Sequence, residues 1–157
     1  MKVLFLDIDG VINSNRTCYA FGGYPHELDP ASMKMFDPVA IRLIQLLCEE
    51  TGAVVVLSST WRMHFTCEEI GKAFGLPVLD KTIVLNDRDR IRGDEIKEWL
   101  DRHPEVTKYA NVDDNSDMLA DQLFCFVKTD DRDGLSLDNY LSLKFLLGVK
   151  DEQKTPD

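Results

Sequence analysis

The sequence predicts an α/β fold with three layers, in which helices cover both faces of a mostly parallel, Rossmann-like sheet. Short apolar runs alternate along the chain with helical segments, as in parallel sheets built from crossover connections. These runs are almost continuous in Val, Leu and Ile, which is typical of strands that are buried on both faces. The chain has 157 residues, which fits one domain with a substantial core.

The first half of the chain predicts two strands with a helix between them. The first strand is expected at residues 3–6 and the second at 53–57. The helix between them has Asp37 as its N-cap and Pro38 at its first position, which is where proline fits best. Gly52 ends this helix, because glycine readily adopts the left-handed conformation found after a helix.

The second half continues the alternation. Apolar residues at helical spacing predict four further helices, at residues 67–74, 93–100, 118–122 and 135–147. Strands are expected at 109–112 and 123–127, whereas the apolar pieces at 78–79 and 83–85 are too short to assign. Two charged runs, at 87–90 and 130–133, are expected to be solvated loops.

Residues 13–36 stand out as a long segment rich in turn-forming residues. We expect an irregular, flap-like loop over the end of the first strand, because long loops in compact domains are usually functional. Its aromatic residues Tyr19, Phe21 and Tyr24 would form either a small core of the loop itself or a platform for substrate. No full cap domain is expected. The predicted domain spans residues 1–148, followed by a polar tail at 149–157.

Bulk properties narrow the function classes. The formal net charge is −10, which argues against stable binding to nucleic acids or to anionic membranes. No apolar stretch approaches the roughly 20 residues of a membrane span, and the first residues lack the features of a signal peptide. The four scattered cysteines are expected to be free thiols, as in a reducing compartment: Cys18, Cys48, Cys67 and Cys125. A cytoplasmic protein that is a monomer or weak dimer is therefore expected.

Polar side chains follow the predicted strands where each strand ends. Asp7 and Asp9 follow the first strand, Ser58 follows the second, and Asp113 and Asp114 follow a later one. The carboxyl ends of parallel strands share one edge of the sheet, so these groups should converge in a crevice there. Neighbouring carboxylates repel each other, and oxygen-rich sites of this kind suit Mg²⁺.

These motifs resemble those of the haloacid dehalogenase superfamily of phosphohydrolases. The resemblance rests on four motifs: residues 7–11, residues 54–58, Arg92, and residues 112–114 with Asp117. Their order and spacing fit over residues 1–147. The segments 57–62 and 92–100 are similar, more narrowly, to the small capless domains associated with "Swiss Army Knife" RNA-repair proteins.

The resemblance implies a role for each catalytic residue. Asp7 would attack phosphorus and form an aspartyl-phosphate. Asp9 would protonate the leaving oxygen and then activate water. Ser58 would donate a hydrogen bond to a phosphoryl oxygen, and Arg92 would stabilise the phosphoryl charge and the nucleophile.

The same resemblance implies a metal site and substrate contacts. Mg²⁺ would lie between Asp7, the backbone carbonyl of Asp9, and Asp113, with Asp114 supporting the metal shell. Substrate-binding contacts are expected from Gly10, Ser59 and Arg62.

Several alternatives stay open at this point. The third motif of the family is most often Lys, so Lys97 and Lys81 compete with Arg92 for that role. The acidic run at 113–117 could be a turn followed by a helix N-cap. Residues 61–62 could be surface packing with a snorkelling arginine rather than a contact to the phosphate or leaving group.

The expected function is that of a Mg²⁺-dependent phosphomonoesterase with an open site. A nucleotide or the phosphate at a nucleic-acid end is the expected substrate on the narrower resemblance, although sugar phosphates and phosphoproteins fit the chemistry too. Two alternatives are a phospho-aspartate signalling domain of the receiver type and a catalytically idle phosphate-binding module. Receiver domains, however, place the phosphorylated Asp after the third strand, where this sequence offers no clear lone Asp.

Overall fold

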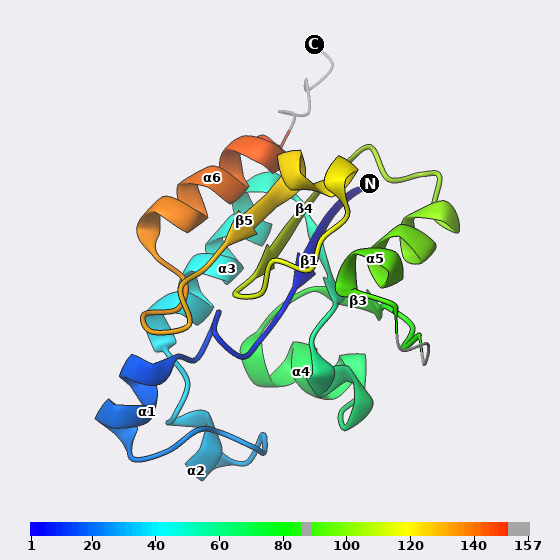
Figure 1. Cartoon of the computed structure of the whole chain (residues 1–157). Coiled ribbons are helices and arrows are strands. Elements are labelled where there is room, and N and C mark those ends of the chain that lie inside the picture. Colours follow the sequence, from blue (N-terminus) through cyan, green and yellow to red (C-terminus); the bar gives the residue numbers. More distant parts are fainter. Residues whose placement is uncertain (86–88, 151–157) are drawn as a thin grey trace.

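A parallel sheet forms the centre of the computed structural model, which describes residues 1–85 and 89–150 (Figure 1). Its strands lie in the order β3-β2-β1-β4-β5, and each neighbouring pair is parallel. The strands are β1 (Lys2–Leu6), β2 (Val54–Leu57), β3 (Val78–Lys81), β4 (Lys108–Asp113) and β5 (Phe126–Lys128). The predicted α/β fold of Rossmann type is confirmed.

Helices cover both faces of this sheet (Figure 1). The core of one face is formed with α3 (Pro38–Thr51), α4 (Cys67–Phe74) and α6 (Leu137–Leu147), and the core of the other with α5 (Arg92–Asp101). Strand β1 contributes to both cores because successive side chains point to opposite faces. Leu4 belongs to the first core, whereas the ring of Phe5 meets that of Trp99 edge-on at 5.5 Å in the second.

Helix α3 begins and ends as the sequence predicts. The Asp37 carboxylate accepts hydrogen bonds from the backbone N–H groups of Val39 and Ala40, and Gly52 follows the helix with φ +73°. The side chain of Asp37 also forms an ion pair with Arg16, at 3.1 Å. This contact ties the start of α3 to the segment that follows β1.

The expectation of an irregular loop at 13–36 is wrong, because this segment contains two short helices, α1 (Asn15–Phe21) and α2 (Pro30–Met33). Ser14 caps α1: its hydroxyl accepts from the backbone N–H of Thr17, whose own hydroxyl accepts from the N–H of Ser14. Tyr19 is 91% exposed and Tyr24 45%, so the aromatic residues do not form a core of their own.

The predicted strand at 123–127 is also too long. Residues Ala120–Cys125 form a 3₁₀ helix, η2, and only Phe126 begins β5. The apolar run misleads here because Phe124 is 86% exposed rather than buried. The expected helix at 118–122 is thus a 3₁₀ turn that starts later. A second 3₁₀ helix, η1 (Thr60–Met63), follows β2.

The short apolar pieces differ from each other. Residues 78–79 belong to β3, whereas 83–85 form no strand in the part of the chain that the structure describes. Two expectations fall partly outside the described residues: the charged run at 87–90 and the tail at 149–157.

Strand register brings the predicted site together. Leu6 of β1 lies opposite Leu57 of β2 and Val112 of β4. The residues that follow these three, Asp7, Ser58 and Asp113, therefore emerge side by side at the carboxyl edge. Strands β2 and β3 lie on one side of β1, and β4 and β5 lie on the other. Open α/β sheets bind ligands at the point where the strand order changes direction in this way.

Candidate active site

A cluster of three carboxylates lies at the carboxyl ends of β1 and β4. One oxygen from each of Asp7, Asp113 and Asp114 lies within 4.8 Å of the others. Asp7 is 6% exposed and Asp113 is 1% exposed. Among the described residues, Asp113 Oδ2 is buried without a hydrogen-bond partner, as expected of an atom whose natural partner is a cation.

Burial of this cluster changes its proton affinity. Desolvation raises the pKa of Asp7, although the charge of Arg92 and a hydrogen bond from Ser59 oppose that rise. Desolvation, followed by repulsion from Asp7, raises the pKa of Asp113 to about 8. A divalent cation would relieve both effects, and an all-carboxylate donor set suits a hard ion such as Mg²⁺. The residues present therefore fit the metal that the sequence predicts.

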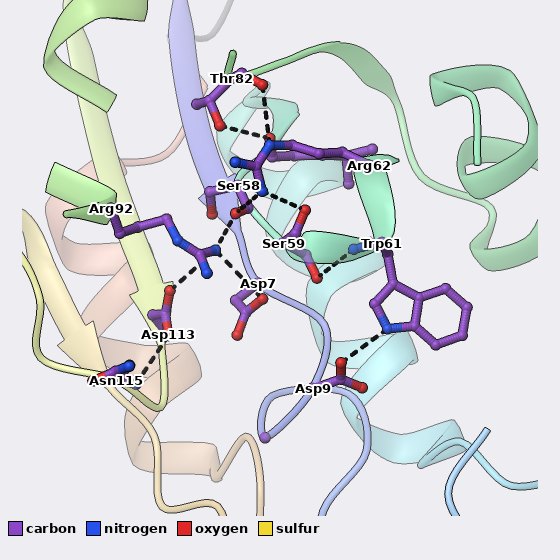
Figure 2. Close-up of polar contacts among 12 residues, drawn as sticks. Asp7, Asp9, Ser58, Ser59, Trp61, Arg62, Thr82, Arg92, Asp113 and Asn115 are labelled. Atoms are coloured by element: carbon purple, nitrogen blue, oxygen red, sulfur yellow. Dashed lines mark hydrogen bonds and ion pairs between the residues drawn. The ribbon is translucent and has the colours of Figure 1, made fainter. Parts of the chain in front are cut away.

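Arg92 brings a positive charge to the same cluster (Figure 2). Its Nη1 lies 3.6 Å from Asp7 Oδ1 and 3.6 Å from Asp113 Oδ2, and it donates a hydrogen bond to the carbonyl of Ser58. The two competing lysines lie elsewhere. Lys97 Nζ pairs with Asp101 on α5, and Lys81 Nζ donates to the carbonyl of Arg62.

Asp117 fixes the position from which Arg92 reaches the site. Its carboxylate accepts from the backbone N–H of Arg92 at 3.3 Å, and its carbonyl accepts from the N–H of Gly93 at 2.9 Å. Gly93 is required by this close approach, because a Cβ there would lie 2.5 Å from the backbone nitrogen of Leu119. The acidic run after β4 thus supplies both metal-ligand candidates and an anchor for the start of α5.

The carboxylate of Asp9 points away from the cluster and is held by two neutral donors. Trp61 Nε1 donates to Asp9 Oδ2 at 3.0 Å (Figure 2), and Asn13 Nδ2 donates to Asp9 Oδ1 at 2.8 Å. Asn13 Oδ1 in turn accepts from the backbone N–H of Gly10 at 3.0 Å. A metal contact through the backbone carbonyl of Asp9 stays a prediction.

Gly10 allows the loop after β1 to pass under Asp114. Its φ is +78°, and a Cβ at this position would lie 2.5 Å from the carboxylate of Asp114. The Gly10 carbonyl accepts a hydrogen bond from Thr129 Oγ1 at 2.7 Å. The residue is therefore needed for close packing against a metal-ligand candidate, whatever its contact with substrate.

Arg62, which is predicted to contact substrate, is engaged by other parts of the protein, and its contact with substrate stays a prediction. Its side chain is 4% exposed, and its guanidinium donates to the carbonyls of Ser58, Ser59 and Thr82 and to the carboxylate of Glu95, at 2.7–3.0 Å. It is not a snorkelling surface arginine. It connects the end of β2 to α5 through the carbonyls of Ser58 and Ser59 and the carboxylate of Glu95, and Figure 2 shows it beside these two serines.

The two serines after β2 have different surroundings. Ser59 forms a side-chain hydrogen bond with Asp7. Ser58 is buried, and its carbonyl accepts hydrogen bonds from both Arg62 and Arg92. The role of the Ser58 hydroxyl toward a phosphoryl oxygen stays a prediction, as does substrate binding by Ser59.

The partners of Asp9 and Arg62 are not apparent from the sequence. Asn13 lies in a turn, Trp61 lies in the 3₁₀ helix η1, and Glu95 lies in α5. The only signal for Asn13 is an amide side chain four residues after Asp9. For Glu95 the signal is an acid in the first turn of α5, which could equally serve the helix dipole.

A pocket of about 730 Å³ opens beside this cluster at Asp9, Gly10 and Asp114. One wall comes from the segment after β1, including Tyr24 and His26. Another wall comes from η1 and the residues that follow it. The segment predicted as a flap thus lines a pocket next to Asp9.

Comparison with known proteins agrees with this geometry. The family model described as "HAD domain in Swiss Army Knife RNA repair proteins" matches residues 3–140. No curated protein and no solved structure matches the chain in the corresponding comparisons. The matched range contains all of β1 except Lys2, the other four strands and every carboxylate of the cluster. The chain belongs to the family of HAD domains in Swiss Army Knife RNA repair proteins, within the haloacid dehalogenase superfamily.

Proposed function

We propose that this protein is a Mg²⁺-dependent phosphomonoesterase that works through an aspartyl-phosphate on Asp7. The observation that carries the proposal is the placement of Arg92 Nη1 at 3.6 Å from both Asp7 and Asp113, inside a buried carboxylate cluster. A cation beside a buried nucleophile favours the approach of an anionic phosphate. Membership of the family supports hydrolase chemistry of the phosphatase type.

Four groups would hold the metal: the carboxylates of Asp7 and Asp113, the backbone carbonyl of Asp9, and Asp114 directly or through water. When bound, Mg²⁺ would supply positive charge that screens the repulsion between the carboxylate and the phosphate. The nucleophilic attack and the proton transfers are carried out by side chains of the protein.

In the first step, an oxygen of Asp7 attacks phosphorus and the bond to the leaving oxygen breaks. The leaving oxygen takes a proton from Asp9, so the departing group is a neutral alcohol. In the second step, Asp9 takes a proton from water, the water oxygen attacks the phosphoryl group, and Asp7 is released with inorganic phosphate. Trp61 and Asn13 keep the carboxylate of Asp9 in one orientation through both steps.

Arg92 and the serines after β2 would stabilise the phosphoryl group. The Arg92 guanidinium is anchored to the carbonyl of Ser58 and needs little reorganisation to serve a phosphoryl oxygen. Ser59 already contacts Asp7 and so holds the nucleophile, while Ser58 would donate to a phosphoryl oxygen. Arg62 positions the two serines by donating hydrogen bonds to their backbone carbonyls.

The substrate would be a phosphorylated small molecule or a nucleic-acid end, recognised at one phosphate without stable nucleic-acid binding. The net charge of −10 supports the expectation that nucleic acids are not bound stably. A cytoplasmic location is supported by the four cysteines, all of which are free. None of the described helices is long and apolar enough to cross a membrane. We propose a monomer or weak dimer.

The alternative of a receiver-type signalling domain is less well supported. The candidate acid/base, Asp9, lies two residues after the nucleophile and is held in place by hydrogen bonds. This arrangement favours rapid hydrolysis of a phosphorylated Asp7 over its persistence. The lifetime of phosphorylated protein separates the two functions.

The first experiment measures phosphate release from a generic aryl phosphate. Wild-type protein is assayed with Mg²⁺ and with EDTA, beside Asp7→Asn and Asp9→Asn. Turnover that needs the metal, Asp7 and Asp9 would support the phosphatase. A phosphoprotein that forms on Asp7 and persists for minutes would instead favour the signalling alternative. Absence of both turnover and phosphorylation in folded, Mg²⁺-loaded protein would favour the idle binding module.

A further inference from the structure

Several residues that line the pocket beside Asp9, among them Tyr24, His26 and His64, have no role in the proposed chemistry. We propose that the pocket binds the uncharged nucleoside of a nucleoside monophosphate, as the leaving group of the reaction. The inference rests on the proposed phosphatase function, since the role of Asp9 decides which side of the site receives the leaving group. It also distinguishes between two substrates, a mononucleotide and the phosphorylated end of a polynucleotide.

The position of the pocket is the first argument. It reaches the site at Asp9, Gly10 and Asp114. Asp9 gives its proton to the leaving oxygen, so that oxygen must lie against the Asp9 carboxylate. The rest of the leaving group then extends into the space next to Asp9, which is this pocket. Its volume of about 730 Å³ lies within the usual range for small-molecule sites, roughly 300–1,000 Å³.

The charge of the lining is the second argument. Four carboxylates line the pocket, those of Asp9, Glu27, Asp114 and Asp131, and no described lysine or arginine does so. Affinity for a phosphodiester backbone comes from lysine and arginine, so a second phosphate in this pocket would be repelled. A leaving group without charge fits; an oligonucleotide does not.

The rings of the two walls are the third argument. Tyr24 and His26 come from the segment between α1 and α2, and Trp61, His64 and Phe65 come from η1 and the turn after it. Trp61 and Phe65 stack at 5.3 Å with 23° between their planes, so this wall is rigid. A lining that contains aromatic and imidazole rings suits a flat heteroaromatic ring, because nucleobases stack well on such side chains.

Polar groups complete the match to a nucleoside rather than a plain aromatic ring. Asn15, Thr60 and Glu27 line the same pocket as the rings. Tyr24 is held in place by a hydrogen bond from its hydroxyl to the Asn15 side chain. Ribose hydroxyls and the edge of a base are the hydrogen-bonding groups that such a lining could satisfy.

The experiment compares three phosphate esters on Mg²⁺-loaded full-length protein. They are a nucleoside 5′-monophosphate, ribose 5-phosphate, which has the same ester and no base, and a 5′-phosphorylated dinucleotide. We expect kcat/KM for the nucleoside monophosphate to exceed that for ribose 5-phosphate by roughly tenfold or more, the scale of one stacked base. We expect the dinucleotide to fall below the mononucleotide.

Two tyrosines of the same segment provide a matched pair of variants. Tyr24→Leu removes a ring from the pocket, whereas Tyr19→Leu makes the same change at a side chain that is 91% exposed and outside the lining. We expect Tyr24→Leu to reduce the preference for nucleotide over ribose 5-phosphate about fivefold or more. Tyr19→Leu should leave that preference unchanged.

Equilibrium binding to Asp7→Asn protein separates failure of this inference from failure of the phosphatase function. If no ester is hydrolysed but the mononucleotide still binds about tenfold tighter than ribose 5-phosphate, the pocket assignment stands and the phosphatase proposal falls. Equal binding and turnover of the two monophosphates would overturn the pocket assignment. A dinucleotide that is preferred over the mononucleotide would overturn it as well.

Discussion

The indole Nε1 of Trp61 donates a 3.0 Å hydrogen bond to Asp9 Oδ2, across 52 positions of sequence. The indole ring packs against two other rings, with Phe65 stacked at 5.3 Å and Phe36 tilted at 5.6 Å. Ring packing therefore fixes the position of the indole N–H independently of its hydrogen bond to Asp9. The candidate acid/base of the site takes its orientation from this rigid group and from Asn13.

Trp61→Phe should lower kcat while leaving the fold intact, because phenylalanine keeps an aromatic ring but cannot donate to Asp9. We expect a reduction of roughly tenfold, part of the 10²–10⁴ that a positioned acid/base contributes. Trp99→Phe is the matched control, because Trp99 Nε1 donates to Asp80 at 2.7 Å in the core that contains α5. Equal effects of the two substitutions would contradict the positioning role.

Arg62→Ala should unfold the protein at lower denaturant concentration rather than weaken substrate binding. Loss of one partner from its buried pair with Glu95 leaves an unpaired buried charge, which costs about 3–5 kcal/mol. Arg42→Ala removes an exposed pair with Glu49 and should cost less than about 1 kcal/mol. Urea titrations give both free energies of unfolding. A rise in KM without a loss of stability would restore Arg62 as a substrate contact.

Asp113→Asn should stabilise the metal-free protein and remove its response to Mg²⁺. Burial raises the pKa of Asp113 from its ordinary value of 3.8 to about 8, so its charged form is disfavoured in the fold. The folded state then binds more protons than the unfolded state between these values, and stability falls as pH rises through this window. In EDTA, the variant should melt clearly above wild type at pH 8 and close to wild type near pH 4. A Tm difference that does not vary with pH would argue against this account.

Gly10→Ala should disrupt the carboxylate cluster, because the added Cβ would lie 2.5 Å from the carboxylate of Asp114. Gly22→Ala is the control: its φ is +84° and nothing lies within 4 Å of the added Cβ. Both substitutions carry the backbone cost of a left-handed residue, about 1–2 kcal/mol. Only Gly10→Ala should also raise the Mg²⁺ concentration needed for activity, by roughly tenfold if about 1.4 kcal/mol of metal binding is lost. Equal Mg²⁺ midpoints in the two variants would show that the position of Asp114 does not matter for metal binding.

The sequence predicts the sheet and the clustered acids well because these depend on local patterns. A continuous apolar run followed by an acid marks a buried parallel strand and its carboxyl end, as at Asp7 and Asp113. Strand register, however, is what brings Leu6 beside Leu57 and Val112, and apolar runs of similar composition do not specify it.

Other parts of the site could not be predicted, because they depend on contacts between distant segments. The sequence suggests a substrate contact or a surface side chain for Arg62, and only the approach of α5 shows its buried pairing with Glu95. The segment at 13–36 reads as irregular since α1 and α2 are short and are held by capping rather than by an apolar face. The predicted strand is too long because it includes the exposed Phe124, whereas β5 starts at Phe126.

The attachment of Asp9 has a consequence for how the selectivity of this protein can change over evolution. Both residues that hold its carboxylate, Asn13 and Trp61, also line the neighbouring pocket. Asn13 and Trp61 would thus contribute both to ligand selection in the pocket and to the orientation of the proposed proton donor, Asp9. Substitutions at these two positions alter rate and preference together, so a lineage that acquires a new substrate has freer variation at Tyr24, His26 and His64.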